Sequence, residues 1–373
     1  LKAKSDIPVL YKQNVANDLF QLIYVFDMGN NHDKALGTAF DYLEYLGTSD
    51  MTPEELKSEF YRLACTFYVS PGNERTYVVL SGLNENMPAA VQLFEKLLAD
   101  AQVNKEAYTN MTSDILKARS DAKLNQGQNF SRLMSFAMYG PKSPATNLLT
   151  EAELTNMNPQ ELVDRIHNQN SYKHRILYYG PSSSKDLLAT INQYHQVPAT
   201  LKDIPAGNEY AYLETPVTKV LVAPYDAKQI YMAQISNLDK KYDPAIEPIR
   251  ALYDEYFGGG MNSIVFQEMR ETRGLAYSAW ASIMPPSYLK YPYVLRTQIA
   301  TQNDKMIDAV TTFNDIINNM PESEAAFKLA KDGLTNRLRT ERIIKGDIIW
   351  SYINAQDLGQ NVDPRIKLYN DIQ

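Results

Sequence analysis

Hydrophobic and polar positions follow a recurring order along the chain. Residues 19–26 (LFQLIYVF) are rich in β-branched and aromatic side chains, which is typical of a buried strand. A polar turn at residues 28–33 separates them from residues 35–46, where the apolar positions have helical spacing. The apolar residues that share one face of this predicted helix are Leu36, Phe40, Leu43 and Leu46.

The same order returns about 210 residues later. Residues 229–235 (QIYMAQI) predict a strand, residues 237–243 a polar turn and residues 245–257 a helix. The ends of the two helices match most clearly, with YLEYLG at 42–47 and YDEYFG at 253–258. Self-similarity at one long, fixed spacing indicates an internal duplication.

Each copy continues with a second strand and an amphipathic helix. These are residues 76–81 with 87–98 in the first copy, and 293–299 with 305–317 in the second. Residues 111–138 predict a long helical stretch. The pattern predicts an α+β fold of two tandem homologous α/β sandwich domains, each a mostly antiparallel sheet with helices packed on one face.

A boundary between the copies is expected at Gln196–Gly207 (QVPATLKDIPAG), which contains two prolines. We therefore predict domains at residues 1–200 and 208–373. The first copy closes with a strand at 174–179, before a Gly-Pro pair. A shift of about 211 residues puts its counterpart beyond Gln373. The C-terminal strand of the second domain is therefore expected to be missing.

Charge and cysteine content exclude several classes of function. The net charge of −7, from 37 basic and 44 acidic residues, argues against a nucleic-acid partner. No apolar run is long enough to predict a membrane span. Cys65 is the only cysteine, which excludes an internal disulfide and any CxxC metal or redox motif.

The stretch FQEMRETRGLAYS at residues 266–278 predicts a helix that turns directly into a strand. Gly274 can take the left-handed conformation that closes a helix, and Arg270 and Arg273 fall in the last turn, where cations favour the helix dipole. The expected core contacts of the helix are Ile264, Val265 and Met269. Side chains expected on one side of the following strand are Leu275, Tyr277 and Ala279.

This corner brings Arg270 and Tyr277 together across a turn. One interpretation is a well-capped helix followed by a core strand. The alternative is a guanidinium and a phenol that face one cleft. A guanidinium holds a carbonyl or carboxylate with fixed geometry, and a phenol can donate a hydrogen bond to a developing oxyanion.

Residues 256–278 (YFGGGMNSIVFQEMRETRGLAYS) resemble the non-catalytic domain of the pitrilysin-type zinc metallopeptidases. This inverzincin family includes insulin-degrading enzyme and the mitochondrial processing peptidase. Its members carry an R-x6-Y pair here, and Arg270 and Tyr277 match that spacing. Both repeats are similar to units of the family, so the resemblance covers nearly the whole chain. It implies two halves, each a pair of α+β domains, that close around a chamber where peptides are cut.

The resemblance also implies an inverted H-x-x-E-H zinc helix in the first domain of the catalytic half, with a distant glutamate as third ligand. In this chain the corresponding helix carries Asp41, Glu44 and Tyr45, so both histidines are replaced. The nearest substitute for the third ligand is Asp121. We therefore expect this degenerate motif to bind no metal, with zinc held by the partner half.

The histidines offer no second zinc motif. None of the four forms an H-x-x-E-H or H-E-x-x-H pair, and structural or solvent-exposed roles are expected for all of them. They are His32, His167, His174 and His195.

The resemblance implies that this chain is the non-catalytic, substrate-binding half of a zinc-dependent metalloendopeptidase, inactive by itself. Arg270 would contact the substrate backbone and Tyr277 the oxyanion of the transition state, from across the chamber. Arg273 is expected to cap the helix or form an ion pair. The implied partners are a peptide substrate and an H-x-x-E-H half, on the same polypeptide or a separate subunit. Bacterial relatives of the family favour an extracytoplasmic, periplasmic location.

Two alternatives remain open. The first is a non-enzymatic scaffold or peptide-binding subunit of the same fold. The second, an independent enzyme without a metal, has no support, because the chain lacks G-x-S-x-G and Cys65 has no histidine nearby in sequence. The glycines at 258–260 lack the G-K-[ST] ending of a phosphate loop, so a turn between helices is expected there.

Overall fold

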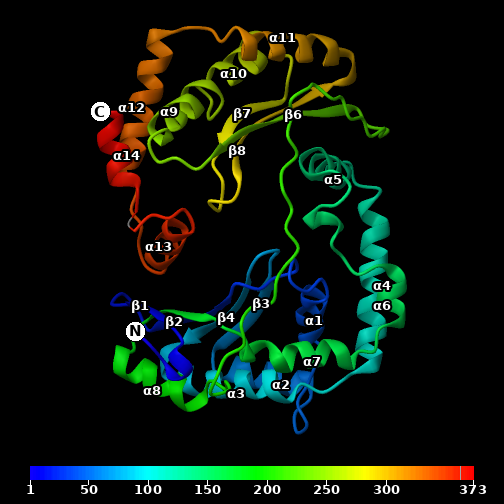
Figure 1. The fold of residues 1–373 in the computed structure, drawn as a ribbon, viewed down its shortest axis with the longest axis vertical. Helices are drawn as coiled ribbons and strands as arrows, with labels where there is room; N and C mark the ends of the chain where they lie inside the picture. Colours follow the sequence, from blue (N-terminus) through cyan, green and yellow to red (C-terminus); the bar gives the residue numbers. More distant parts are fainter. Residues whose placement is uncertain (362) are drawn as a thin grey trace. The chain divides into compact units, whose positions relative to one another are not determined.

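A five-stranded sheet organises the first unit of the chain, with strand order β1-β5-β2-β4-β3 (Figure 1). The strands are β1 (Val9–Gln13), β2 (Leu19–Phe26), β3 (Cys65–Pro71), β4 (Thr76–Leu83) and β5 (Arg175–Gly180). β5 runs parallel to β1 and antiparallel to β2, and the remaining neighbours are antiparallel. The computed structural model describes residues 1–361 and 363–373.

Helices cover one face of this sheet, as Figure 1 shows for α2, α3, α7 and α8. The helices of the unit are α1 (Leu36–Leu43), α2 (Pro53–Arg62), α3 (Met87–Asp100), α4 (Lys105–Ala122), α6 (Glu151–Asn156), α7 (Gln160–Asn168) and α8 (Ser184–Tyr194). Alternate residues of β2 point into the layer between sheet and helices, where Leu22 and Tyr24 join one core with Phe40 of α1 and Phe94 of α3. The predicted helix face of the first copy, Leu36 to Leu46, is buried in this core.

The opposite face of the sheet is also partly covered. Ile23 and Val25 of β2 are buried there, in alternation with the residues that face the helices. The short segment Ile344–Trp350 belongs to this unit, and the Trp350 ring lies edge-on to Tyr77 with 5.3 Å between centroids. Both faces of the central strands are therefore shielded from water, which explains their nearly continuous apolar sequence.

The second unit has a three-stranded antiparallel sheet of order β6-β8-β7. Its strands are β6 (Gln229–Lys241), β7 (Ser278–Met284) and β8 (Pro292–Gln302). Its helices are α5 (Gln126–Tyr139), α9 (Glu247–Phe257), α10 (Ile264–Phe266), α11 (Met306–Asn318), α12 (Glu324–Thr340) and α14 (Arg365–Ile372), and it shares α13 (Asp347–Asp357) with the first unit. Phe257, Val265, Ile299 and Phe313 form the centre of its core.

Contacts divide the described chain into two units. The first comprises Leu1–Asp121, Pro144–Tyr210 and Ile344–Trp350, and the second comprises Ala122–Ser143, Ala211–Ile343 and Ser351–Gln373. Helix α5 thus belongs to the second unit, where Phe130 packs edge-on against Tyr231. The predicted fold class is confirmed: both units are α/β sandwiches with mostly antiparallel sheets.

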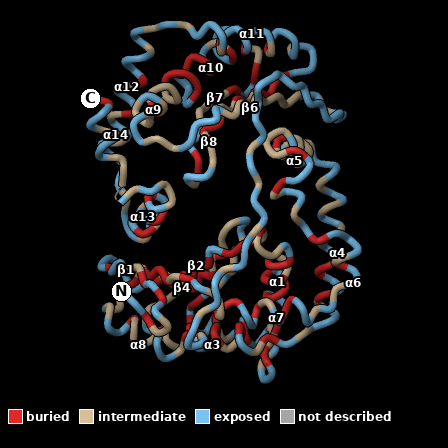
Figure 2. The backbone as a smooth tube through the Cα atoms, in the orientation of Figure 1, coloured by how far each residue is buried: buried red, intermediate tan, exposed pale blue. Residues whose placement is uncertain are grey.

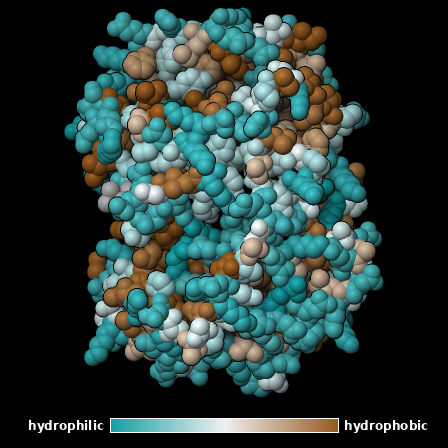
Figure 3. Space-filling model, in the orientation of Figure 1, coloured by the Kyte–Doolittle hydropathy of each residue, from teal (hydrophilic) through white to brown (hydrophobic). Residues whose placement is uncertain are grey.

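The visible surface is mostly polar (Figure 3), as expected for a chain in which 22% of the residues are charged. The visible face in Figure 3 is mostly hydrophilic, with hydrophobic side chains in small groups. Buried residues concentrate along the sheets and the inner sides of the helices (Figure 2). In the part of the chain that the structure describes, no helix has the length and apolarity needed to cross a membrane.

Candidate functional site

The predicted helix-to-strand corner begins at a capped helix. The Phe266 N–H donates to Ser263 Oγ at 3.4 Å, and α10 then continues as a π-helical turn at Gln267–Thr272. The turn ends at Gly274, which has φ of +56°, and its N–H donates to the carbonyl of Arg270 at 3.1 Å. The predicted left-handed glycine at the end of the helix is confirmed. π-Helical turns are rare and are frequent at functional sites.

Two buried side chains anchor this corner. Val265 and Met269 are fully buried, as predicted, and the N–H groups of Leu275 and Ala276 both donate to the Met269 carbonyl, at 2.8 and 3.1 Å. These bonds fix the backbone just before the following strand, so the position of the next residue, Tyr277, is set by the core.

The predicted strand alternation after Gly274 is wrong at its start. Strand β7 begins only at Ser278, because the preceding backbone is bonded to the end of the helix. Tyr277 is 72% exposed whereas Ala279 is 7% exposed, so the two side chains do not share one side.

Arg270 and Tyr277 lie together on the surface of the second unit. The guanidinium carbon of Arg270 is 5.7 Å from the centroid of the Tyr277 ring and 5.1 Å from that of Phe266. Such distances are within the range of cation–π attraction. The Tyr277 N–H donates to the Ala300 carbonyl at 2.9 Å, which ties the tyrosine to β8.

The polar ends of this pair remain accessible. The nearest charged partner of Arg270 is Glu271, at 3.7 Å between Nε and Oε1, and the Arg270 side chain is 47% exposed. Within the described residues, the Tyr277 hydroxyl makes no hydrogen bond and Arg270 makes no side-chain hydrogen bond. Two exposed donors, one charged and one neutral, therefore lie side by side, with Glu271 as the ion-pair partner of Arg270.

Arg273 has a different role. Its Nε lies 3.3 Å from Oε2 of Glu268, one turn earlier, so it forms the expected ion pair. The first glycine of the run at 258–260 serves close packing: a Cβ on Gly258 would lie 2.1 Å from the carbonyl oxygen of Ala281. Only glycine allows α9 to end this close to β7.

The degenerate zinc motif lies at the end of α1. The helix ends at Leu43, so Asp41 is on the helix, Glu44 caps it and Tyr45 lies in the following turn. Burial raises the pKa of the Asp41 carboxyl, and the charge of Glu44 raises it further. With Asp41 and Tyr45 at the two histidine positions, this helix end offers neither of the imidazole ligands of an H-x-x-E-H zinc site.

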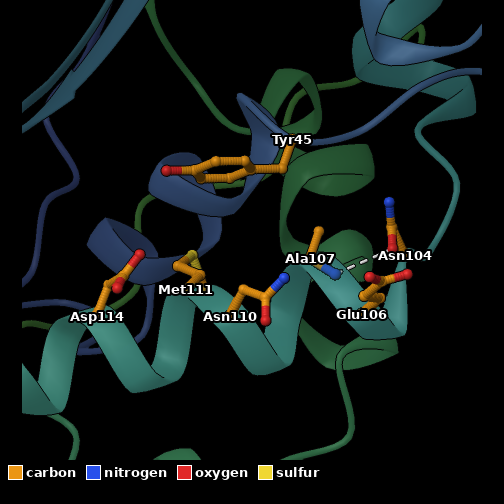
Figure 4. A pocket seen from close by; sticks show the side chains of 7 residues that line it. All are labelled: Tyr45, Asn104, Glu106, Ala107, Asn110, Met111 and Asp114. Carbon is orange, nitrogen blue, oxygen red and sulfur yellow. Dashed lines mark hydrogen bonds between the residues drawn. The ribbon is translucent and has the colours of Figure 1, made fainter.

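A pocket of about 250 Å³ separates Tyr45 from α4 (Figure 4). The residues that line it are Tyr45, Asn104, Glu106, Ala107, Asn110, Met111 and Asp114. Its carboxylates, Glu106 and Asp114, precede the predicted third-ligand substitute Asp121 on the same helix. No group of three His, Cys, Asp or Glu side chains among the described residues could hold a metal ion.

Two histidines belong to a buried network that the sequence did not reveal. His195 Nδ1 lies 2.7 Å from Glu95 Oε1, and His195 Nε2 lies 2.8 Å from His174 Nε2. Glu95 also accepts from the Gln196 N–H and from the Asn170 side chain. The one sequence feature that could have indicated this network is Glu95, an acidic residue on the apolar face of α3, between Val91 and Leu98.

Burial explains the electrostatics of this network. Desolvation and, to a smaller extent, the neighbouring His195 together lower the pKa of His174 to about 3, although a hydrogen bond to the Tyr172 carbonyl acts in the opposite direction. Burial also raises the pKa of the Tyr24 hydroxyl well above its usual range, with Glu95 adding to the effect. Since His195 and Glu95 have almost no exposed surface, the network ties α3 to the segment after α8 and offers no surface for a substrate.

The other two histidines have local partners. His32 Nδ1 accepts from the Gly29 N–H at 3.1 Å, and His167 Nε2 lies 3.1 Å from the Ala101 carbonyl oxygen. Both contacts are to backbone within the first unit, so the expected structural roles fit these residues.

Comparison with known proteins identifies related sequences. Residues 176–334 match the family described as the peptidase M16 inactive domain. An uncharacterized zinc protease of Rickettsia felis is 20% identical over 263 residues, which is 67% of this chain and 60% of that protein. The chain thus spans about 60% of the length of the curated relative it matches.

Solved structures share the fold. The peptidase M16 inactive domain from Pseudomonas fluorescens superposes with a TM-score of 0.72 at 16% identity, over 100% of this chain and 90% of that one. The periplasmic protease PqqL from Escherichia coli gives 0.78 at 15% identity, over 99% of this chain and 42% of that one. A mutant of the ferredoxin protease FusC, in complex with Arabidopsis ferredoxin, gives 0.71 at 11% identity, over 96% and 40%.

Proposed function

We propose that this chain, a relative of the M16 zinc peptidases that matches their inactive domain at residues 176–334, binds the peptide substrate for a catalytic half that it lacks. The observation that carries the proposal is the pair of exposed donors formed by Arg270 and Tyr277. They stand on a corner whose backbone is hydrogen-bonded to the carbonyl of the buried Met269, which supports a defined backbone position for Tyr277.

Zinc, the cofactor of the family, does not fit the first unit of this chain. A zinc site needs three deprotonated nitrogen, sulfur or carboxylate ligands that converge on one point. Asp41 and Tyr45 stand at the two histidine positions, and the helix ends at Leu43, before Glu44 and Tyr45. The zinc chemistry therefore belongs to an H-x-x-E-H half, on the same polypeptide or on another subunit.

Arg270 suits the backbone of a peptide. Its guanidinium presents several N–H donors in a rigid plane, and two of them can meet one carbonyl or carboxylate group. The rings of Phe266 and Tyr277 limit where this plane can lie. Arg270 would thus hold a peptide carbonyl in one orientation before cleavage.

The hydroxyl of Tyr277 is suited to stabilise the negative charge that develops on the carbonyl oxygen of the substrate. A tyrosine hydroxyl that makes no internal hydrogen bond can donate to an oxyanion as the carbonyl becomes tetrahedral. The exposed phenol of Tyr277 would therefore add to transition-state stabilisation only when the chain is closed against the catalytic half. We further propose an extracytoplasmic location, supported by the periplasmic PqqL among the structural relatives.

The test is cleavage of a fluorogenic peptide library by the chain combined with its H-x-x-E-H half. Tyr277→Phe is expected to lower kcat by roughly tenfold to a thousandfold, the range for loss of one oxyanion donor. Tyr61→Phe is the matched control, because Tyr61 is also an exposed tyrosine but lies in the first unit. Unchanged cleavage with Tyr277→Phe would favour the scaffold alternative.

A further inference from the structure

Strand β6 holds the same place in the second unit as β2 in the first. Leu19 at the start of β2 pairs with Leu83 at the end of β4, and Gln229 at the start of β6 pairs with Gln302 at the end of β8. Both β4 and β8 lead into a 3-10 turn and then into a helix that begins with Met87 or Met306. The two strands are therefore counterparts in the duplication.

Their burial differs sharply. Six of the eight residues of β2 are buried, whereas no residue of β6 is (Figure 2). The sequence of β6 is nevertheless apolar, with Ile230, Met232 and Ile235 among its first seven residues. β6 is thus an apolar strand without buried residues, whereas its counterpart β2 is mostly buried. We therefore expect a further element to cover β6.

The uncovered atoms can be identified from the pairing. The Gln234 N–H donates to the hydroxyl of Thr297, its partner on β8, so the even-numbered residues of this part of β6 bond toward β8. The N–H and C=O groups of Tyr231, Ala233 and Ile235 therefore point away from the sheet. Among the described residues these groups have no hydrogen-bond partner.

Side chains close both ends of this edge. Gln126 Nε2 donates to the Gln229 carbonyl at 2.7 Å, and the Asn237 N–H donates to Thr215 Oγ1 at 3.0 Å. The open part of the edge is thus limited to the stretch from Tyr231 to Ile235, which suits one short strand.

In the first unit, β5 covers the equivalent edge of β2. Gln21 pairs with Tyr179 and Val25 with Arg175, in antiparallel register. On its other side β5 pairs in parallel with β1, where Val9 lies opposite Ile176. β5 is therefore inserted between two strands that are adjacent in sequence.

The second unit contains a counterpart of β1 as well. β1 begins ten residues before β2, and ten residues before Gln229 stands the segment Lys219–Ala223 (KVLVA). Its residues form no regular structure and, within the described chain, no hydrogen bonds. Val220 and Val222 are 83% and 77% exposed. An apolar segment with a free backbone, ten residues before a strand with an open edge, is what we expect where the strand that pairs with both is not among these residues.

We propose that a strand from a segment of the same polypeptide outside residues 1–373 inserts antiparallel to β6 and parallel to Lys219–Ala223. The register of the first unit assigns the pairs: the first, third and fifth residues of this strand lie opposite Ile235, Ala233 and Tyr231. Its second and sixth residues lie opposite Lys219 and Ala223.

The inserted strand must be apolar at its centre. In β5 the three central residues, Ile176, Leu177 and Tyr178, are all buried, because helices and strands cover them on both faces. The source follows from the duplication, since β5 comes from the same polypeptide and follows α7 of its unit in the chain. A second copy of the chain or a free peptide would have to lose translational freedom to reach the same place.

Hydrogen exchange within the chain itself gives the first test. The amides of Tyr231, Ala233 and Ile235 are expected to exchange at least tenfold faster than those of their counterparts Gln21, Ile23 and Val25, which β5 covers. Equal protection would overturn the proposal, because something within residues 1–373 would then already cover the edge.

The second test supplies a strand. A copy of residues 169–180, which contains β5, is attached after Gln373 through a Gly-Ser linker. We expect slower exchange of the three β6 amides, by tenfold or more, and a higher Tm. A matched extension in which the three central apolar residues are lysine should give neither effect. Failure of the apolar extension to protect these amides would overturn the proposal.

A third test distinguishes the possible sources of the strand that covers β6. Ala233→Pro removes an N–H that points away from β8, and an edge strand tolerates such a proline. The substitution should prevent the extension from pairing with β6, so that the amides of Tyr231 and Ile235 lose their protection. Sedimentation of the unextended chain is expected to show a monomer with and without this substitution. A dimer that Ala233→Pro dissociates would assign the edge to a second copy and overturn the proposed source.

Discussion

The guanidinium carbon of Arg270 lies 5.7 Å from the centre of the Tyr277 ring, although the two residues belong to different elements. Arg270 stands on the π-helical turn, and Tyr277 follows the left-handed Gly274 that ends it. The carbonyl of the buried Met269 accepts two N–H groups from the intervening backbone. The pair is thus set by the core of the unit, which lets substitutions at its exposed ends be tested without loss of the fold.

Arg270→Lys is expected to reduce cleavage by the combined halves while leaving the thermal unfolding of the chain unchanged. Lysine keeps the positive charge but loses the planar fork, and loss of a hydrogen bond with a charged donor costs about 1.5–3 kcal/mol, or roughly tenfold to a hundredfold in kcat/KM. Arg273→Lys is the matched control, since Arg273 pairs with Glu268. Equal losses for both variants would contradict a specific contact by Arg270.

The purified chain is expected to contain far less than one zinc per molecule after zinc saturation and desalting. The reason is the ligand set at the end of α1, where Asp41 and Tyr45 stand at the histidine positions. Inductively coupled plasma mass spectrometry measures the content, and an H-x-x-E-H half treated in parallel gives the positive control. A ratio near one that Glu106→Gln or Asp114→Asn removes would locate a metal in the α4 pocket instead.

Acid is expected to destabilise the first unit through His174. Its pKa is lowered to about 3 in the folded chain, so between this value and the ordinary value near 6.5 only the unfolded chain binds the proton. Stability therefore falls as the pH falls through this window, by up to about 1.4 kcal/mol per pH unit. Urea unfolding at several pH values measures the slope. His174→Gln should flatten it, whereas His167→Gln should leave it unchanged.

Glu95→Gln is expected to destabilise the chain by about 1–3 kcal/mol, the cost of leaving buried hydrogen-bonding groups without their partner. Glu95 accepts from the Gln196 N–H and the Asn170 side chain and lies 2.7 Å from His195, and the side chains of Glu95, Asn170 and His195 are buried. Glu106→Gln, on the exposed surface of α4, should change stability by less than about 0.5 kcal/mol. Urea unfolding at pH 7 compares the two variants, and similar values for both would show that the network adds little.

Local sequence was enough to predict the fold class and the corner that carries the candidate site. Periodicity marked the strands and helices of both repeats, because side chains repeat every two residues along a strand and every 3.6 along a helix. Gly274 signalled the end of its helix because only glycine enters the left-handed region at little cost. The R-x6-Y spacing then singled out Arg270 and Tyr277.

Other features depended on contacts between residues far apart in the chain. Glu95 and His195 are 100 residues apart, so no local pattern could join them into one network. The exposure of Tyr277 followed from backbone bonds to Met269, which delayed β7 and reversed the expected alternation. Likewise, the sequence of β6 indicates an apolar strand, but which neighbour covers it is a property of the sheet. Sequence therefore determined what each segment can form, and the tertiary structure decided which surfaces and polar groups are covered, because burial depends on the whole set of neighbours.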